Sequence, residues 1–266
     1  MKTVFIGDLH GRSTWKDIIA KEQPDHVVFM GDYFDSFDLS ATVQMHNFQE
    51  LIEYKTTTKA NVIMLIGNHD VHYFSGTNDN TTSGFQRTAY WQINQLVEDN
   101  KHHMQMAYQY GEFLCSHAGI SPEWLNKQGY NYSEGSIVRF VNDLWKHKPR
   151  AFSFADNGYG HSDPYGDDTF QTPTWIRPKS LMKACKDTSL KQDYIQIVGH
   201  TEVEKIDIEG KATGGRYYFI DAIPSAQYLV HTEERGLTLG QLLRYDKKEE
   251  QQTTADVSTT DQGKSI

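Results

Sequence analysis

The sequence predicts a protein of the α/β (α+β) class, and two observations support this. In the first 66 residues, short apolar runs alternate with segments of helical periodicity. This is the pattern of βαβ units and a mainly parallel sheet. In the last third of the chain, short strands with alternating apolar residues follow one another between turns, which predicts a second, more antiparallel sheet.

The first half supplies the parallel strands and their connecting helices. The expected strands are Thr3 to Gly7, His26 to Met30 and Asn61 to Ile66, and the expected helices are Ser13 to Lys21 and Ala41 to Tyr54. In a sheet of this kind, ligands bind outside the carboxyl ends of the strands. Residues that directly follow these strands are therefore the first to consider for a functional site.

The middle of the chain is less regular. We expect helices at Gly84 to Val97, Ser121 to Gln128 and Ser136 to His147, and a hairpin of Met104 to Tyr110 with Glu112 to Ser116. Residues 153–177 are rich in Gly, Asp, Pro and aromatic residues and lack periodicity. A loop of this length in a compact domain is usually functional or disordered, and its aromatic residues favour an ordered loop over the site.

The C-terminal part contains the strands of the second sheet. They are expected at Tyr194 to Val198, Glu204 to Ile208, Arg216 to Ile220 and Gln227 to His231. Residues 1–245 are interpreted as one domain. Residues 246–266 are polar and have almost no core-forming side chains, so we expect a disordered tail.

Composition excludes several classes of protein. The 266 residues carry a formal net charge of -9, which argues against stable binding to a nucleic-acid backbone. The two cysteines, Cys115 and Cys185, lack CxxC spacing and are expected to be reduced. No signal peptide is evident, and no run approaches the roughly 18 apolar residues of a membrane span. We therefore expect a cytoplasmic protein without membrane contact, of unknown oligomeric state.

Five short segments end an apolar run with side chains that bind metals. They are residues 7–11 (GDLHG), 31–35 (GDYFD), 67–70 (GNHD), 116–119 (SHAG) and 199–201 (GHT). A single segment would indicate only a turn, a helix cap or a packed histidine. Five in this order predict a site assembled from distant parts of the chain.

The residue types at these positions suit two divalent cations. The candidates combine carboxylate, amide and imidazole groups without a thiolate: Asp8, His10, Asp32, Asn68, His117 and His200. This mixture favours Mn²⁺, with Fe, Zn or Ni as alternatives, over Ca²⁺ or Mg²⁺. Two ions can activate water and neutralise phosphoryl oxygens. They would also leave the site positively charged within an acidic protein.

At these motifs the sequence resembles the calcineurin-like metallophosphoesterase superfamily. It is most similar to the phosphoprotein-phosphatase branch, which includes Ser/Thr phosphatases and symmetrical diadenosine-tetraphosphate hydrolases. The resemblance implies a four-layer αββα sandwich with a dinuclear metal site at the strand ends. It also implies hydrolysis of phosphate monoesters by a hydroxide that bridges the two metals.

The resemblance assigns a role to each motif residue. Asp8 and His10 would bind the first metal, Asp32 would bridge both, and Asn68, His117 and His200 would complete the second. His69 would be the general acid for the leaving oxygen, with Asp35 as its orienting partner. Arg177, in the segment WIRP before the last motif, is a candidate phosphate ligand.

Some positions depart from the Ser/Thr phosphatases. In those enzymes an Arg-Gly pair follows the second Asp of the motif, whereas Ser36 and Phe37 follow Asp35 here. A phosphodiesterase or dinucleoside-polyphosphate hydrolase therefore stays open as an alternative, as does a binding module that keeps the fold without catalysis. The expected partner is a phosphorylated substrate: a phosphoprotein, a nucleotide or a small phosphoester. Histidines outside the motifs, His72 among them, are interpreted as surface or packing residues.

Overall fold

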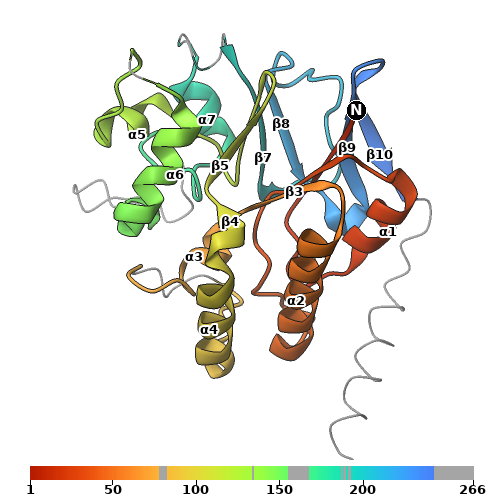
Figure 1. Cartoon of the computed structure of the whole chain (residues 1–266). Coiled ribbons are helices and arrows are strands. Elements are labelled where there is room, and N and C mark those ends of the chain that lie inside the picture. Colours follow the sequence, from red (N-terminus) through yellow and green to blue (C-terminus); the bar gives the residue numbers. More distant parts are fainter. Residues whose placement is uncertain are drawn as a thin grey trace, which may run out of the picture.

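Two β-sheets lie against each other, and helices cover their outer sides (Figure 1). The structure is a computed structural model that describes residues 1–77, 83–133, 135–154, 168–186, 188, 190 and 193–242. Residues 155–167 of the predicted loop and the predicted tail 246–266 lie outside this part. The order of layers is helix, sheet, sheet, helix, so the expected αββα sandwich is confirmed.

The first sheet has the strand order β10-β9-β1-β2-β3-β4 within the described residues. Strands β1 to β4 run parallel, while β9 and β10 are antiparallel to their neighbours. The bounds are β1 Lys2–Ile6, β2 His26–Phe29, β3 Asn61–Leu65, β4 Met104–Gln105, β9 Gln227–Thr232 and β10 Gly236–Gln241.

The second sheet has the order β5-β6-β7-β8 and mixed pairing. Its strands are β5 Ala107–Tyr110, β6 Phe113–Ser116, β7 Ile195–Glu202 and β8 Tyr217–Asp221. β5 and β6 are antiparallel, whereas β6, β7 and β8 are parallel. The carboxyl ends of β6 and β7 therefore point the same way, which lets residues that follow β6 meet residues of β7.

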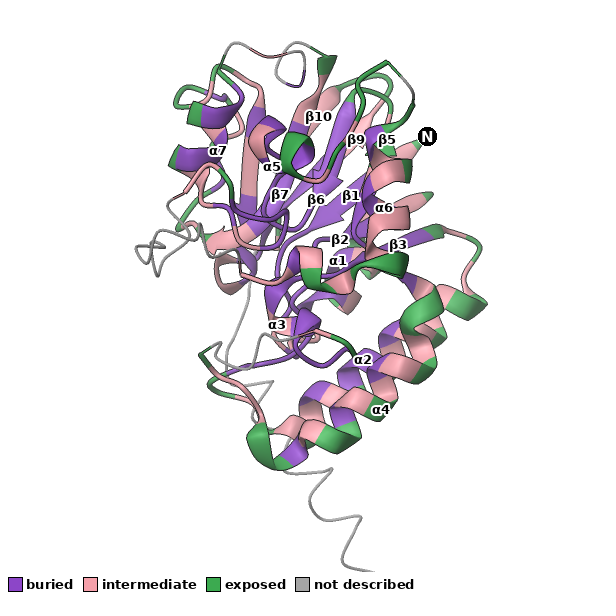
Figure 2. Cartoon of the chain, turned by 90° about the vertical axis from the view of Figure 1, so that its left-hand side faces the viewer, coloured by how far each residue is buried: buried purple, intermediate pink, exposed green. Residues whose placement is uncertain are grey.

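The two faces of the first sheet belong to different cores. Alternate side chains of a strand point to opposite faces. On β1, Phe5 packs between the sheets with Phe113, Cys115 and Ile197. Val4 and Ile6 of the same strand join the larger core under the helices. Cys115 is buried and free, as the sequence predicted. Both faces of β1 are thus buried, which Figure 2 shows as purple strands inside a layer of mixed colours.

Helices flank both sheets and begin at recognisable caps. The side chains of Ser40, Ser121 and Ser136 accept hydrogen bonds from backbone N–H groups of the first turns of α2, α5 and α6. The bounds are α1 Thr14–Glu22, α2 Ala41–Thr57, α3 Asn68–Val71, α4 Tyr90–Asn100, α5 Pro122–Lys127, α6 Ile137–His147 and α7 Pro178–Ala184. Within the described residues, none of the helices combines the length and apolar character needed to cross a bilayer.

Several sequence predictions of elements need correction. Residues 204–208 form bends and turns instead of a strand, and the Ile206 N–H donates to the side chain of Gln227 rather than to the backbone of a strand. The predicted strand Met104 to Tyr110 is two strands, β4 and β5, in different sheets. The last predicted strand, β9, joins the first sheet beside β1. The second sheet is accordingly less antiparallel than predicted.

Gly7 allows the two sheets to approach at the site. A Cβ atom on Gly7 would lie 2.2 Å from the carbonyl oxygen of Ile220, a distance that backbone atoms cannot accommodate without a shift. We expect Gly7→Ala to lower the free energy of unfolding by about 2–4 kcal/mol, measured by urea denaturation. Gly111→Asn is the control. Gly111 has open space and a φ of 57°, which Asn tolerates. Equal stability of the two variants would contradict this close contact.

Candidate metal centre

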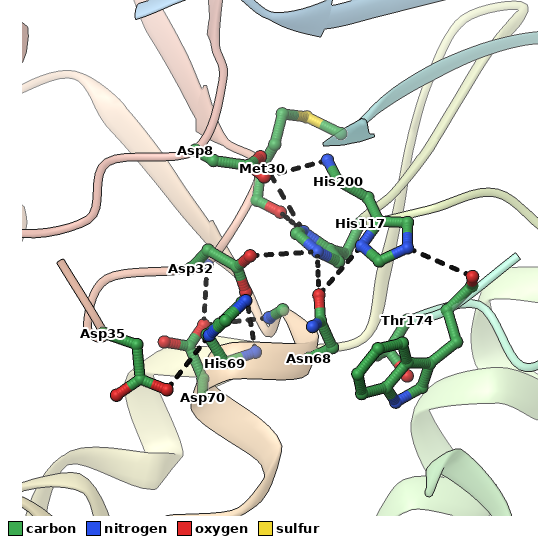
Figure 3. A network of polar contacts seen from close by, with 12 residues as sticks. Asp8, Met30, Asp32, Asp35, Asn68, His69, Asp70, His117, Thr174 and His200 are labelled. Carbon is green, nitrogen blue, oxygen red and sulfur yellow. Dashed lines mark hydrogen bonds and ion pairs between the residues drawn. The ribbon is translucent and has the colours of Figure 1, made fainter. Parts of the chain in front are cut away.

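Predicted motif residues from distant parts of the chain come together at one site, and Figure 3 shows Asp8, Asp32, Asn68, His117 and His200 there. Asp8, Asp32 and Asn68 follow the adjacent parallel strands β1, β2 and β3. His117 directly follows β6, and His200 lies within β7 at an irregularity of its pairing with β8. Five segments that belong to two sheets thus meet at one place, as the sequence predicted.

The backbone at this edge is held in an uncommon conformation. Among the described residues, six other than glycine have a positive φ, and four of these are His10, Asp32, Asp35 and His200. Their φ values lie between 45° and 65°, in the left-handed region that costs a non-glycine residue about 1–3 kcal/mol. Such strain persists only where the surroundings fix the residue, and it is concentrated here at the candidate site.

Three atoms with free lone pairs lie close together: Asn68 Oδ1, His117 Nε2 and His200 Nδ1. The His117 Nδ1–H group donates to the carbonyl of Met30 at 2.8 Å. The His200 Nε2–H group donates to the carbonyl of Trp175 at 3.1 Å. In a neutral ring the other nitrogen carries a lone pair. His117 Nε2 and His200 Nδ1 therefore present lone pairs to the Asn68 Oδ1 atom, at 2.8 and 2.9 Å. Acceptors facing one another in this way fit a cation between them.

The pKa values of these histidines favour the neutral rings. Burial lowers the pKa of His117, although the negative charge of Asp32 opposes the shift. Burial lowers the pKa of His200 well below its usual value, and electrostatic interactions with His117 and Arg177 lower it further. A neutral imidazole is the form that binds a metal ion.

A second group of donors lies on the other side of Asp32. Ligand atoms of Asp8, His10 and Asp32 all lie within 4.8 Å of one another. The His10 Nδ1–H group donates to the carbonyl of Phe34 at 2.7 Å, which leaves Nε2 as the free nitrogen. Oδ1 of Asp8 is buried, and none of the residues that the structure describes donates a hydrogen bond to it. A buried carboxylate oxygen in that state is costly unless a cation meets it, so these residues also fit a metal ion.

The Asp32 carboxylate lies between the two groups. Its Oδ2 atom is 3.8 Å from His10 Nε2 and 3.4 Å from His117 Nε2. Burial would raise the pKa of Asp32, but electrostatic interactions with His117, His69 and His10 outweigh burial and lower it. A single ionised oxygen therefore faces an imidazole from each group, which is the placement that a bridging ligand needs.

Asp70 holds two of the motif loops together. Its carboxylate accepts hydrogen bonds from the backbone N–H groups of Asp32, Tyr33 and Gly67, at 2.8, 2.8 and 2.9 Å. It is fully buried, and burial together with the charge of Asp32 raises its pKa well above the usual value. The three N–H donors compensate in part for that burial, and they fix the loop that carries Asp32.

Asp35 and His69 form the predicted pair. His69 Nδ1 lies 3.0 Å from Asp35 Oδ2, and the His69 ring lies 5.1 Å from that of His10, centroid to centroid. Burial would lower the pKa of His69, but Asp32 and Asp35 outweigh burial and raise it. Burial would raise the pKa of Asp35, but its contacts with His69 and His72 hold it well below the usual range. The pair thus favours an ionised carboxylate beside a protonated ring.

Two arginines lie at the margins of the site. Arg177 Nη1 donates to Thr201 Oγ1 at 3.1 Å and to the carbonyl of His200 at 3.4 Å. Arg12 is ion-paired with the exposed Asp38 at 3.6 Å. A cavity of about 130 Å³ opens beside Asp8 and His10, and Arg12 belongs to its lining. All the predicted site residues therefore lie at or beside one centre.

Sequence reasoning gave no role to three residues of this region. Asp70 holds the loops, His72 contacts Asp35 at 2.9 Å, and Asp221 lines the cavity near Asp8. Burial and the charge of Asp32 raise the pKa of Asp221 to about 7. A signal existed for His72, because it lies three residues after His69 and thus on the same side of a helical turn. Asp221 has no motif around it that would single it out.

The sequence matches the family described as calcineurin-like phosphoesterase over residues 1–204. The chain therefore belongs to that family, and it is a hydrolase that acts on phosphoric ester bonds and requires divalent metal ions. Among solved structures, it is similar to a metallophosphoesterase from Sphaerobacter thermophilus. The two share 13% identity over 97% of this chain and 95% of that chain, with a TM-score of 0.48. Curated proteins give no match.

The role of Asp70 can be tested by changing one oxygen. Asp70→Asn replaces an acceptor by an NH₂ group that would face a backbone N–H. We expect the free energy of unfolding to fall by about 2–4 kcal/mol in urea titrations. Asp38→Asn, on the neighbouring loop and 75% exposed, should change it by less than about 0.5 kcal/mol. Similar values for the two variants would show that the buried contacts are dispensable.

Proposed function

We propose that the protein is a metal-dependent phosphatase that hydrolyses phosphate monoesters, as in the phosphoprotein-phosphatase branch of the family. The observation that carries this proposal is the convergence of Asn68 Oδ1, His117 Nε2 and His200 Nδ1 next to a shared Asp32 oxygen. Asp8 and His10 lie on the opposite side of that oxygen. Two neighbouring sets of ligands with one carboxylate between them suit a pair of metal ions.

The proposal keeps the division of ligands that the resemblance implies. Asp8 and His10 would hold one ion, Asn68, His117 and His200 the other, and Asp32 would contact both. When bound, such a pair supplies an activated water and neutralises charge on the phosphoryl oxygens. Nitrogen and oxygen donors without a thiolate favour Mn²⁺, with Fe, Zn or Ni as alternatives.

The two arginines support a substrate with a terminal phosphate. The charge of Arg177 contributes to the lowered pKa of His117 and of His200, after burial. The charge of Arg12 acts in the same way on His10, after burial and neighbouring groups. Guanidinium groups therefore lie near both ligand sets. A monoester dianion carries more charge for such groups than a diester does, and Arg177 is the proposed phosphate ligand.

His69 is proposed as the general acid. Its Nδ1–H group donates to Asp35, and its Nε2–H group would protonate the leaving-group oxygen. The Nε2–H bond breaks as an O–H bond forms, and the electron pair of the broken P–O bond stays on the leaving oxygen. The raised pKa of His69 keeps that proton available near neutral pH.

One observation favours the alternative substrate class. Ser36 stands where the Ser/Thr phosphatases have an arginine, and the next residue, Phe37, is 78% exposed at the rim of the cavity. An exposed aromatic ring beside the site suits a nucleobase or another planar group. A dinucleoside polyphosphate or another phosphodiester is thus the second candidate substrate. A binding module without catalysis is disfavoured because the metal-ligand types and the His69–Asp35 pair are all present.

The metal sites can be tested by binding. We expect metal-free protein to take up two Mn²⁺ ions per chain in a calorimetric titration. At a concentration of Mn²⁺ about 100 times Kd, each site should stabilise the fold by roughly 2.7 kcal/mol. Asp32→Asn should weaken both sites, because it contacts both ligand sets, whereas Asp38→Asn should bind as the wild type does. A single ion per chain, or none, would contradict the assignment.

The reaction can be tested with two chromogenic substrates. We expect the Mn²⁺-loaded protein to hydrolyse p-nitrophenyl phosphate faster than bis-p-nitrophenyl phosphate. Asp32→Asn and His69→Asn should each lower kcat/KM by roughly 10²–10⁴-fold. Folding is checked by circular dichroism, and Asp99→Asn, at an exposed position on α4, is the control. Faster turnover of the diester would select the alternative, and full activity of either active-site variant would refute its role.

A further inference from the structure

The Asp35 carboxylate is held by more groups than its partnership with His69 requires. Oδ2 lies 3.0 Å from His69 Nδ1 and 2.9 Å from His72 Nε2. Oδ1 accepts a hydrogen bond from the Tyr73 hydroxyl at 2.6 Å. The side chains of Asp35 and His72 are fully buried. Both oxygens of one buried carboxylate are therefore fixed, Oδ1 by Tyr73 and Oδ2 by the two histidines.

The chain supplies these contacts from one short segment. His69 and His72 are three residues apart on α3 and its C-terminal end, so their rings lie on the same side of the turn. Tyr73 follows at once. The Tyr73 hydroxyl also accepts a hydrogen bond from the backbone N–H of Gln86 at 3.0 Å. That second bond fixes the hydroxyl so that its proton points at Asp35.

Aromatic packing fixes the two side chains that lie behind Asp35. The Phe85 ring is 4.8 Å from that of His72 and 5.5 Å from that of Tyr73, centroid to centroid. The His72 and Tyr73 rings are 4.3 Å apart. Rings in such a cluster have few alternative rotamers. His72 and Tyr73 therefore act as a rigid support rather than as adaptable surface groups.

Rotation of the Asp35 carboxylate would move the His69 ring. A carboxylate with only His69 as partner could turn about its own axis and carry the hydrogen-bonded ring with it. With Oδ1 tied to Tyr73 and Oδ2 shared with His72, that rotation is blocked. A displacement of about 1 Å at a catalytic group can cost roughly 100-fold in rate, so this restriction matters for proton transfer.

We propose that His72 and Tyr73 are positioning residues that orient Asp35 and, through it, direct the His69 Nε2–H group at the leaving-group oxygen. The inference rests on the proposed role of His69 as general acid. It goes beyond the pair of Asp35 and His69, because it extends the catalytic arrangement to two residues that touch neither substrate nor metal ligand sets.

Leaving-group dependence tests this role. A general acid matters for phenyl phosphate, whose leaving group needs a proton, and little for 2,4-dinitrophenyl phosphate, whose leaving group does not. We expect Tyr73→Phe and His72→Leu to lower kcat roughly 10–100-fold on phenyl phosphate and less than about 3-fold on 2,4-dinitrophenyl phosphate. His72→Gln, whose amide can reach toward Asp35, should recover most of the loss. Tyr90→Phe, in the same aromatic cluster, should match the wild type.

The outcomes separate the inference from the function on which it rests. Equal losses on both substrates, or no loss, would overturn the positioning role while the phosphatase assignment stands. A wild-type protein that hydrolyses neither substrate with any divalent ion would overturn both. If Asp32→Asn lowers kcat on both substrates and Tyr73→Phe lowers it only on phenyl phosphate, the positioning role and the phosphatase assignment are both supported.

A measurement without turnover guards against misfolded variants. In metal-free protein with ¹⁵N-labelled histidine, the His69 Nδ1–H proton should be protected from exchange with water by its bond to Asp35. We expect Tyr73→Phe to lower that protection at least about 10-fold. The variant should still unfold in one cooperative transition in urea, which shows that its fold is intact. Unchanged protection in Tyr73→Phe would show that the hydroxyl does not hold the pair, and it would overturn the inference.

Discussion

Backbone N–H groups from one motif loop hold the carboxylates of another, and the rest of the site depends on this exchange. Asp8 accepts from the N–H of His200 at 2.9 Å, and Asp32 accepts from that of His69 at 2.9 Å. Asp70 accepts from the loop of Asp32. Each buried carboxylate needs donors to offset its loss of water. Because those donors come from a different loop, satisfying the charge also fixes the relative positions of the loops.

The same arrangement explains how an acidic chain can serve phosphate chemistry. The Asp8 and Asp32 carboxylates accept hydrogen bonds from neutral backbone N–H groups, and burial favours the neutral rings of His117 and His200. These carboxylates are therefore stabilised with little contribution from positively charged side chains. Cations added to the ligand sets would leave an excess of positive charge, and Arg12 and Arg177 lie where they can add to it. The overall charge of -9 is thus compatible with an anionic substrate.

The sequence predicted the placement of the motif residues at strand ends better than it predicted the strand order of the sheets. Asp8, Asp32 and Asn68 stand at the ends of short apolar runs, and local sequence is enough to place such residues at strand ends. The pairing of β9 with β1 joins Lys2 to Thr232, and no local pattern contains that information. His72 was missed for a related reason. Its ring acts through a contact with Asp35, and a contact between residues 37 positions apart is invisible until both loops are placed.

The position of β9 has a consequence for biosynthesis. Residues 227–232 occupy the place beside β1 in the first sheet, so this edge of β1 stays open until those residues have been synthesised. His200, too, emerges long after Asp8, although the two are joined in the finished protein. Nascent chains would thus expose an apolar, unpaired edge for much of translation. Because that edge closes late, we expect chaperones to bind it while the protein is being synthesised.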